Sequence, residues 1–498
     1  MSLTLGLLAV VAAWTVGYFV YGQVILYRKR HANGCETATH ASPWDPVFGL
    51  KHAMALKKAM SERRNLEHFE GMFKKYGNTF EVCLLGNPMH FTCEPENIQA
   101  ILATKFADWD MGPRRKRATF EFVGVGIFSA DGKDWVHART MARPQLTRSY
   151  FADVAVWEAH LQSWFQAMKE QEPGGKPIEM QEWTQRYTLD VGTELLSGRS
   201  LHVLHADRAH MGRRFLWALD RANNLISERL RAGKLSFLVK DPNLNEARGV
   251  LHEHIDPMLH EAIASHKSGA IVEDAKYTLP RALAADGIPL EQIRDHVLNL
   301  LLAAVGSEAS LIITLFFVVA KYPIVQERLR REIEETVGRR APEYEEIRNM
   351  RYLNWVIKET LRMYPPVPQN LRVANKDTVL PVGGGPDGRS PVFIAKGREC
   401  SFSSFSLQRR RDLWGEDALE FKPERWEKER PTWNYIPFSG GPRICLGQQL
   451  ALVGGGYTLV RFMQQYSVFK APNPNVEWQE KLNITCFVNN GVQVTLEE

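Results

Sequence analysis

An apolar run from Val297 to Ala320 is the strongest constraint on how this chain can fold. A helix that is hydrophobic on every side has to be buried. Within the run, however, residues 301–312 read LLAAVGSEASLI, so a glycine, two serines and a glutamate interrupt it. Glycine costs a helix about 1 kcal/mol relative to alanine, and a buried carboxylate costs more unless it is hydrated or paired. We expect a ligand and water beside this part of the helix; the alternative is a kink filled by crossing side chains, with Glu308 in a structural ion pair.

A second apolar segment lies at the start of the chain. Ser2 to Tyr27 carries no charged side chain and is followed by RKRH at 28–31. About 20 apolar residues span a bilayer, and the absence of a preceding basic residue favours a retained signal anchor over a cleaved signal peptide. Cations directly after the span place the following chain in the cytoplasm. We therefore expect a transmembrane anchor at 1–27, a linker at 28–45 and one catalytic domain at 46–498.

The composition excludes several classes of protein. Among 498 residues, 44% are hydrophobic and 24% are charged, which is typical of a globular protein. The net charge of +5 is spread along the chain, so nucleic acid is not an expected partner. The cysteines lie far apart without a CxxC spacing, which predicts neither a disulfide scaffold nor a zinc site. They are Cys35, Cys83, Cys93, Cys400, Cys445 and Cys486.

Helical patterns dominate the rest of the chain. Apolar residues recur at three and four positions in 52–77, which predicts helix. Strand patterns occur at 79–93, with Gly-Asn-Pro as the turn, and at 391–402. The Asn-Gly pair within 482–498 separates two strand-like runs and predicts a hairpin. No repeat or second domain boundary is evident, so the fold class is mainly α with a small β region.

A glycine-rich loop near the end of the chain leads to Cys445, where a helical pattern begins. The free N–H groups at a helix start stabilise a thiolate, which can ligate a metal or attack an electrophile. Glycines let the backbone approach a flat partner closely, and Arg443 is suited to pairing with a carboxylate. The alternative is a buried structural cysteine.

Phe438, Gly441, Arg443, Cys445 and Gly447 match every fixed position of the haem-binding signature of cytochrome P450 monooxygenases. The chain resembles this family from the anchor to the terminal segment. The resemblance implies the cytochrome P450 fold, with an N-terminal transmembrane helix added, and haem b as cofactor. It also implies that Cys445 is the thiolate ligand of the iron, which favours O–O cleavage.

Other motifs follow in the order of the family. The sequence KETLR supplies Glu359 and Arg362, which by themselves are more typical of a solvated ion pair than of a functional motif. The resemblance implies that they form a buried triad with Arg425 behind the haem. It further implies a set of cofactor-binding residues, in which a tryptophan and three arginines serve the haem propionates: Trp135, Arg139, Arg372 and Arg443, with Phe438 and Gly447 in the loop.

The polar interruption aligns, as VGSEAS, with the oxygen-activating segment of the family. This alignment places Gly306 over the iron, Glu308 at the conserved acid and Ala309 where the family carries a proton-delivering threonine. Alanine has no hydroxyl, and Ser310 lies about 100° further round the helix, so it substitutes only if the helix rewinds locally. Three explanations stay open: a substrate hydroxyl orders water, Glu308 with Ser307 or Ser310 forms an altered relay, or the reaction needs no ordinary O–O cleavage.

The substrate-contacting regions of the family map onto a loop at 111–128, the helix at 213–230, the long helix, the segment before Arg372, and 485–491. Phenylalanine and leucine in these regions predict an apolar ligand. The basic run at 114–117 pairs with an acid group of the ligand or forms a solvated face.

Segments 383–397 and 409–426 look most similar to fungal microsomal hydroxylases of alkanes and fatty acids. The resemblance implies a single-pass protein of the endoplasmic reticulum membrane, in contact with membrane lipid. It would insert one atom of O2 into an apolar, hydroxyl- or carboxyl-bearing lipid or fungal secondary metabolite, with NADPH-cytochrome P450 reductase as partner. The alternatives are peroxide rearrangement, isomerisation or oxidative cyclisation, or a haem-binding membrane protein without turnover.

Overall fold

The computed structural model describes residues 20–41, 48–146, 154–172, 176–267 and 278–497, together with positions 14, 17 and 45. It is mainly helical with small sheets, as the sequence predicts. The principal helices are α2 (Leu50–Ser61), α3 (Asn65–Tyr76), α4 (Pro95–Gln99), α5 (Gly112–Val123), α6 (Gly132–Ala142), α8 (Ala155–Gln171), α9 (Met180–Ser197), α10 (Ala209–Ala232), α11 (Leu244–Lys267), α12 (Leu279–Ala285), α13 (Leu290–Lys321), α14 (Pro323–Thr336), α15 (Tyr344–Asn349), α16 (Arg351–Met363) and α19 (Gln448–Gln465). The helical pattern at 52–77 is thus divided between α2 and α3.

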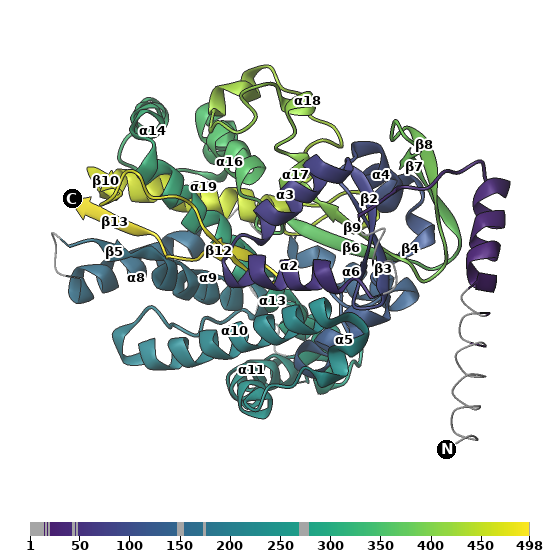
Figure 1. The fold of residues 1–498 in the computed structure, drawn as a ribbon. Coiled ribbons are helices and arrows are strands. Elements are labelled where there is room, and N and C mark those ends of the chain that lie inside the picture. Colours follow the sequence, from purple (N-terminus) through teal and green to yellow (C-terminus); the bar gives the residue numbers. More distant parts are fainter. Residues whose placement is uncertain are drawn as a thin grey trace.

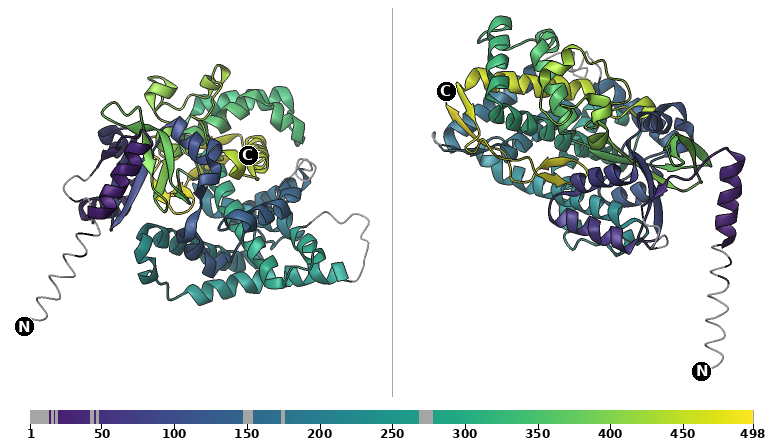
Figure 2. Two further views of the ribbon diagram at one scale, coloured as in Figure 1. Left: turned by 90° about the vertical axis from the view of Figure 1, so that its right-hand side faces the viewer. Right: turned by 45° about the horizontal axis from the view of Figure 1, so that its top comes forward.

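The largest sheet has six strands and lies at the end of the molecule next to the N-terminal helix (Figures 1 and 2). Its order is β1 (Thr39–His40), β2 (Thr79–Leu84), β3 (Asn87–Thr92), β9 (Glu399–Ser403), β6 (Gln369–Ala374) and β4 (Trp109–Asp110). The predicted hairpin at 79–93 is confirmed, because β2 and β3 pair antiparallel with Thr79 opposite Thr92. β7 (Thr378–Gly384) and β8 (Ser390–Ile394) form a separate hairpin.

The predicted C-terminal hairpin is wrong. An Asn-Gly turn does join β12 (Cys486–Val488) to β13 (Gln493–Glu497), but these strands do not pair with each other. Instead, β12 pairs with β11 (Glu480–Leu482), whereas β13 lies between β10 (Val468–Lys470) and β5 (Ile178–Glu179). The pairing of β13 with β5 is accompanied by a hydrogen bond of 3.1 Å from the Val492 amide to the Glu179 carboxylate.

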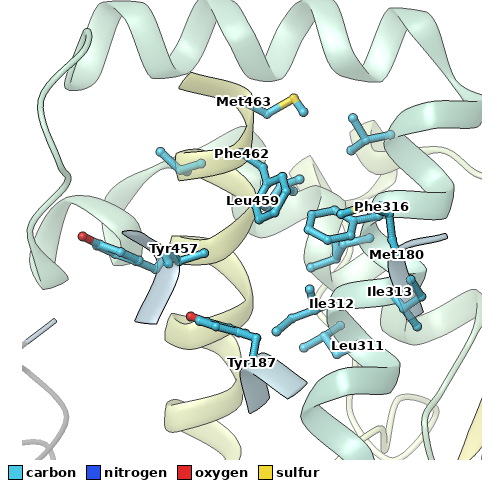
Figure 3. Packing of buried hydrophobic residues seen from close by; sticks show 14 of the residues in the cluster. Met180, Tyr187, Leu311, Ile312, Ile313, Phe316, Tyr457, Leu459, Phe462 and Met463 are labelled. Atoms are coloured by element: carbon cyan, nitrogen blue, oxygen red, sulfur yellow. The ribbon is translucent and has the colours of Figure 1, made fainter. Parts of the chain in front are cut away.

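Helix α13 connects two hydrophobic clusters. Its apolar residues between 297 and 305 pack with residues of α5, α10, α11 and α12. Its residues 311–320 pack with α8, α9, α14, α16 and α19, where Phe316 meets Phe462 at 4.7 Å between ring centroids (Figure 3). The polar interruption therefore lies at the boundary between the two clusters.

The predicted anchor at 1–27 lies mostly outside the described residues. Residues 20–32 are helical, so this helix continues into the predicted linker, and it projects from the body beside β7 and β8 (Figures 1 and 2). Its base is fixed by an ion pair of 2.7 Å between Lys29 and Asp377, and Val20, Tyr21 and Tyr27 expose apolar surface. Among the described helices, α13 is the one long and apolar enough to cross a membrane, but most of its surface is buried in the protein.

Candidate functional site

The loop before α19 holds Cys445 in a fixed position. Gly441 has a φ of +65°, and a Cβ there would lie 1.8 Å from the Leu102 carbonyl oxygen, so only glycine fits. The Cys445 amide donates to the Phe438 carbonyl oxygen at 3.0 Å and closes the loop. At Gly447, a Cβ would meet only the Cys445 Sγ, at 3.9 Å. The loop therefore packs tightly at Gly441 and stays open around Cys445, whose side chain is exposed.

Two opposing effects act on the Cys445 thiol. Although the side chain itself is exposed, the protein packed around the loop raises the pKa of the thiol by desolvation, and this outweighs the lowering by the Gly447 amide and the Arg139 guanidinium. The helix start alone therefore does not produce the thiolate that the sequence predicts. A bound metal ion deprotonates a coordinating thiol outright, so ligation supplies what the helix start does not.

Three arginines form a buried cluster of positive charge beside the loop. Arg372 and Arg115 are only 3% and 7% exposed, and the side chains of both bond to the Asn370 Oδ1, at 3.2 and 2.9 Å. Burial and the neighbouring arginines lower the pKa of Arg372 to about 9, and burial and Arg443 lower that of Arg115 to about 10. Arg443, whose pKa burial also lowers, donates to the Asp131 carboxylate at 2.7 Å.

This cluster fits a cofactor with two carboxylates. Asp131 is the one carboxylate that contacts it among the described residues, and it also accepts the backbone amides of Met111 and Gly112. Arg114, the neighbouring cation, is already paired with Glu399. The Nε atoms of Arg115 and Arg443 are buried and have no hydrogen-bond partner in the part of the chain that the structure describes. Buried cations need anions, so the cluster suits further negative charge of the kind that the propionates of haem b would supply.

Arg115 was expected only as part of the basic run that pairs with an acid group of the ligand or forms a solvated face, and not among the haem-binding residues. The region 111–128 was expected to be a loop, but residues 112–123 form α5. Arg115 lies on the buried face of that helix with Ala118, Thr119 and Phe122, at spacings of three, four and seven. This periodicity is visible in the sequence, and it separates Arg115 from the exposed Lys116 and Arg117.

Trp135 links the arginine cluster to the cysteine loop. The Arg443 guanidinium lies 4.3 Å from the centre of its ring and that of Arg139 lies 5.8 Å away. Arg139 donates to the Ile444 carbonyl oxygen at 3.0 Å, directly before Cys445. The structure thus brings together Trp135, Arg139, Arg443 and the loop residues that the sequence analysis named, with Arg372 adjoining through the cluster.

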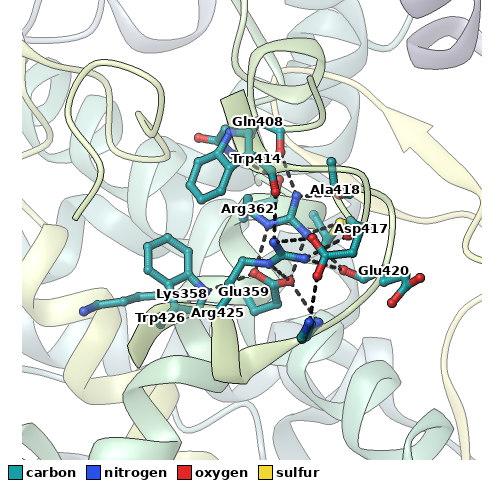
Figure 4. Close-up of polar contacts among 12 residues, drawn as sticks. Lys358, Glu359, Arg362, Gln408, Trp414, Asp417, Ala418, Glu420, Arg425 and Trp426 are labelled. Carbon is teal, nitrogen blue, oxygen red and sulfur yellow. Dashed lines mark hydrogen bonds and ion pairs between the residues drawn. The ribbon is translucent and has the colours of Figure 1, made fainter. Parts of the chain in front are cut away.

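Glu359, Arg362 and Arg425 meet in the core (Figure 4). The Glu359 carboxylate accepts Arg362 at 2.8 and 2.9 Å and Arg425 at 2.9 Å, and Trp426 donates to it at 3.0 Å. Both Glu359 and Arg362 are fully buried, which a solvated surface pair would not be. Arg362 also donates to three backbone carbonyls, those of Gln408, Ala418 and Glu420, and so fixes the segment that leads to the cysteine loop.

One face of α13 is left uncovered by other side chains. Between residues 297 and 320, only Ala303, Ala304, Gly306 and Ser307 are not buried. The Ser307 hydroxyl donates to the Ala303 carbonyl oxygen at 2.7 Å, one turn earlier on this face. The open face therefore carries Ser307 as its hydroxyl group.

Ala309 and Ser310 lie elsewhere on the helix. Ala309 is fully buried, and the Ser310 hydroxyl donates to the Cys486 carbonyl oxygen at 2.6 Å. Because α13 is helical throughout, no local rewinding brings Ser310 to the open face. The alignment that placed Ala309 and Ser310 at the oxygen site is therefore corrected: in this structure both point into packed protein.

Glu308 also points away from the open face. A Cβ on Gly454 of α19 would lie 2.4 Å from the Glu308 Oε1 and 2.7 Å from the Trp157 Nε1, so the carboxyl group lies against these two residues. Burial raises its pKa to about 8, only partly offset by Trp157. Glu308 is thus a neutral acid at pH 7. Among the described residues it has no ion-pair partner, so the alternative of a structural ion pair is not supported.

Comparisons of the sequence with known proteins point to one family. A sequence model of the family described as Cytochrome P450 matches residues 43–494. The cytochrome P450 monooxygenase fsdH of Fusarium heterosporum is 37% identical over 100% of this chain and 90% of its own length. The cytochrome P450 monooxygenase himC of Aspergillus japonicus is 36% identical over 97% and 88%. Cytochrome P450 52A5 of Candida maltosa is 34% identical over 96% and 94%.

Proposed function

This chain belongs to the cytochrome P450 family and is a monooxygenase that binds haem b, and from that premise we propose its reaction. It inserts one atom of O2 into an apolar substrate that carries a hydroxyl or carboxyl group, with electrons from NADPH-cytochrome P450 reductase. The observation that carries the proposal is the pairing of an open Cys445 with three buried arginines that face a single carboxylate.

The chain's residues divide into those that hold the cofactor and those that support them. Haem b, when bound, supplies the binding and reductive activation of O2. Cys445 would ligate its iron, and Arg115, Arg372 and Arg443 would pair with its propionates. The Glu359 triad is a positioning group, since it fixes the backbone behind Cys445 without touching the cofactor.

Ser307 is the residue that we assign to proton delivery. A hydroxyl group both donates and accepts, and that of Ser307 is already oriented by the Ala303 carbonyl on the open face. This assignment replaces Ala309 and Ser310, and it leaves Glu308 outside the relay because its neutral carboxyl group lies against Gly454 and Trp157. Gly306 contributes space beside Ser307.

The expected substrate is apolar because apolar side chains line the part of a small cleft that lies next to α13. These side chains are Leu301, Leu302 and Val305 of α13 and Phe487 of the terminal strands. A lipid or an apolar secondary metabolite fits such a lining, and Thr485 is available to orient a polar group.

The chain is also proposed to be a single-pass protein of the endoplasmic reticulum membrane. Residues 1–27 would form the anchor, 28–45 the linker and 46–498 the cytoplasmic catalytic domain. Support comes from the exposed apolar side chains of the projecting helix and the cations that follow them, among them Lys29 and Arg30.

The test is reconstitution of the full chain with reductase, NADPH and a panel of fatty acids, fatty alcohols and alkanes. We expect the reduced carbon monoxide complex to absorb near ~450 nm, which thiolate ligation produces. We also expect ¹⁸O from ¹⁸O2 in the product, and Cys445→Ala abolishes both signals. Product that forms from a lipid peroxide without NADPH, or haem binding without any turnover, would overturn the proposed reaction.

A further inference from the structure

A cavity lies between the projecting helix and the main sheet. The helix lines it with Gln23, Leu26 and Arg30, whose spacings of three and four place them on one helical face. The other walls come from β1, β2 and β3 and from β8 with the turn that follows it. The cavity has a volume of about 590 Å³, and sites for small molecules typically measure about 300 to 1,000 Å³. It is therefore large enough for a ligand.

A row of polar side chains forms the floor of this cavity. His40 of β1 is paired with Glu81 of β2, and Glu81 is paired with His90 of β3. Residues that are paired across neighbouring strands point to the same face of a sheet, so the three side chains lie next to one another. His90 is only 5% exposed, and its Nδ1 has no hydrogen-bond partner in the described part of the chain. A buried polar group without a partner is rare, so the floor offers an unused group to a ligand.

Both signs of charge line the cavity. Arg30 and Arg398 supply the cations, and Glu36 and Glu81 supply the carboxylates. Arg398 and Glu81 are 3.8 Å apart, which is a long ion pair, so neither group is fully used by the other. Guanidinium groups match the geometry of a phosphate, and carboxylates accept hydrogen bonds from an ammonium group. The charges therefore suit a ligand that is itself a zwitterion.

The cavity also lies at the depth of lipid headgroups. The predicted span ends at Tyr27, and Arg30 follows it by three residues, or about 4.5 Å along a helix. The headgroup layer on each side of a bilayer is about 5 to 8 Å thick. Leu26 and Phe393 add hydrocarbon to the walls of the cavity, which suits the glycerol and the first chain carbons of a phospholipid.

We propose that this cavity binds the headgroup of a zwitterionic phospholipid that carries a primary ammonium group, as phosphatidylethanolamine does. Arg30, Arg398 and His90 take the phosphate, and Glu36 and Glu81 take the ammonium group. The bound lipid joins the helix to the body and thereby fixes how the body is oriented on the membrane. The inference rests on the proposed membrane anchor, because the lipid comes from the bilayer that the anchor spans.

This lipid site is separate from the haem site. Its floor ends at β3, and β9 lies between β3 and β6, the strand that carries Arg372 of the arginine cluster. None of the residues that line the cavity belongs to the cysteine loop or to the arginine cluster. Changes in the lipid site should therefore leave the haem spectrum unchanged.

The first test is native mass spectrometry of the haem-loaded full chain after incubation with equal amounts of three lipids of identical acyl chains. We expect one phosphatidylethanolamine to be retained about tenfold better than phosphatidylcholine, whose methylated ammonium group cannot donate a hydrogen bond; tenfold corresponds to one charge-assisted bond. Phosphatidylglycerol, which lacks the ammonium group, should also be retained less. Equal retention of all three lipids, or a preference for phosphatidylglycerol, would overturn the proposal.

Two soluble probes separate the lipid from its headgroup. We expect phosphoethanolamine to displace the bound lipid only at high concentration, because it lacks the parts that contact Leu26 and Phe393. Inorganic phosphate should displace it even less, since it has no ammonium group. Displacement by inorganic phosphate at the same concentration as phosphoethanolamine would identify a simple phosphate site and overturn the proposal.

A matched pair of variants tests the cation on the helix. Arg30→Gln removes a cation that lines the cavity, whereas Arg28→Gln removes the same charge from the same basic run but outside the cavity. We expect retention of phosphatidylethanolamine to fall about tenfold for Arg30→Gln alone, with the reduced carbon monoxide spectrum unchanged in both variants. Equal losses would indicate general attraction of the basic run to lipid and would contradict the site.

Glu81→Gln tests the ammonium subsite in the same assay. We expect the preference for phosphatidylethanolamine over phosphatidylglycerol to disappear, because the variant loses a carboxylate and keeps both arginines. An unchanged preference would exclude Glu81 from the site and overturn the assignment of the ammonium group.

Failure of this site and failure of the anchor give different results. A chain that resists extraction from microsomes with alkaline carbonate but retains no phosphatidylethanolamine keeps the anchor and overturns the lipid site. A chain that carbonate releases, but that still selects phosphatidylethanolamine after purification, supports the lipid site and contradicts the anchor.

Discussion

Ser307 and Ser310 are separated by one turn, yet they have opposite surroundings. Ser307→Ala removes the hydroxyl of the open face, so we expect product per NADPH to fall about tenfold while haem binding is kept. Ser310→Ala instead loses the bond to the Cys486 carbonyl, so we expect about 1 kcal/mol less stability and unchanged coupling. NADPH, hydrogen peroxide and product are measured together. If Ser310→Ala uncouples the enzyme and Ser307→Ala does not, the assignment is reversed.

Arg115 gives a prediction about the cofactor alone. Arg115→Met retains most of the buried volume but removes one unneutralised cation. We expect the variant to lose haem about 10-fold faster or more, because it lacks one charge-assisted bond to a propionate. The free energy of unfolding of the haem-free chain should not fall, because the substitution removes a buried cation that the neighbouring arginines repel. Transfer of haem to apomyoglobin measures the first effect, with the exposed Lys116→Met as control. If Arg115→Met and Lys116→Met transfer haem at the same rate, Arg115 does not belong to the haem site.

Glu308 makes stability depend on pH. Its folded pKa of about 8 exceeds the ordinary 4.5, so the folded state binds the proton more tightly than the unfolded chain does. The stabilisation is complete below pH 4.5 and is lost as pH rises to about 8, by up to about 1.4 kcal/mol per unit. Glu308→Gln lacks this slope. Urea unfolding of Glu308→Gln and of the unchanged protein at pH 6 and pH 7.5 is the measurement. If the free energy of unfolding changes equally with pH in both proteins, Glu308 is not a protonated, neutral acid.

The sequence predicts which residues belong to the site better than it predicts where their side chains point. Cys445 and its arginine partners follow from a loop motif whose spacing is fixed by Gly441. The direction of the Ser307 side chain does not follow from the motif, because a shift of one residue on α13 turns a side chain by about 100°. The rotation of the helix is fixed by its packing, in which Glu308 lies against Gly454 and Ser310 bonds to Cys486. Arg115 was visible as a helical period but was hidden within a basic run.

At the scale of elements, the Glu359 triad joins α16 to the segment before Cys445. Glu359→Gln leaves Arg362 and Arg425 buried without their anion, so we expect a loss of about 3 to 5 kcal/mol. The control is Glu427→Gln, which breaks an exposed pair with Arg351 and should cost less than about 1 kcal/mol. Urea unfolding measures both. If Glu359→Gln does not accumulate, Arg425→Lys retains one charge and should show a smaller loss; equal stability of all variants would contradict the triad's role.

Local sequence patterns predicted those elements whose hydrogen bonds join residues that are near each other in the chain. The hairpin of β2 and β3 and the long helix α13 are of this kind, since pairing and burial are set by neighbouring residues. The C-terminal strands are not, because β5, which pairs with β13 and carries Glu179, lies about 310 positions away along the chain. A turn motif specifies the turn, but the pairing of the strands after it depends on distant contacts.

At the scale of the whole molecule, the sequence predicts an anchor that is separable from the catalytic body. The projecting helix meets the body through few contacts, such as the pair of Lys29 with Asp377, whose side chains are 48% and 38% exposed. Exposed pairs of this kind contribute about 1 kcal/mol or less. The body should therefore fold and bind haem without the anchor.

A chain comprising residues 28–498 tests this division. We expect it to bind haem and give the same reduced carbon monoxide spectrum as the full chain, because the three arginines and Cys445 belong to the body. The full chain should resist extraction of microsomes with alkaline carbonate, since about 20 apolar residues hold a helix in a bilayer, and the shortened chain should be released. A tag after Glu498 should be digested by protease in intact microsomes, because the cations after the span keep the body in the cytoplasm. Retention of the shortened chain in carbonate would mean that the body itself enters the bilayer, and loss of its haem would mean that the anchor is part of the folded domain.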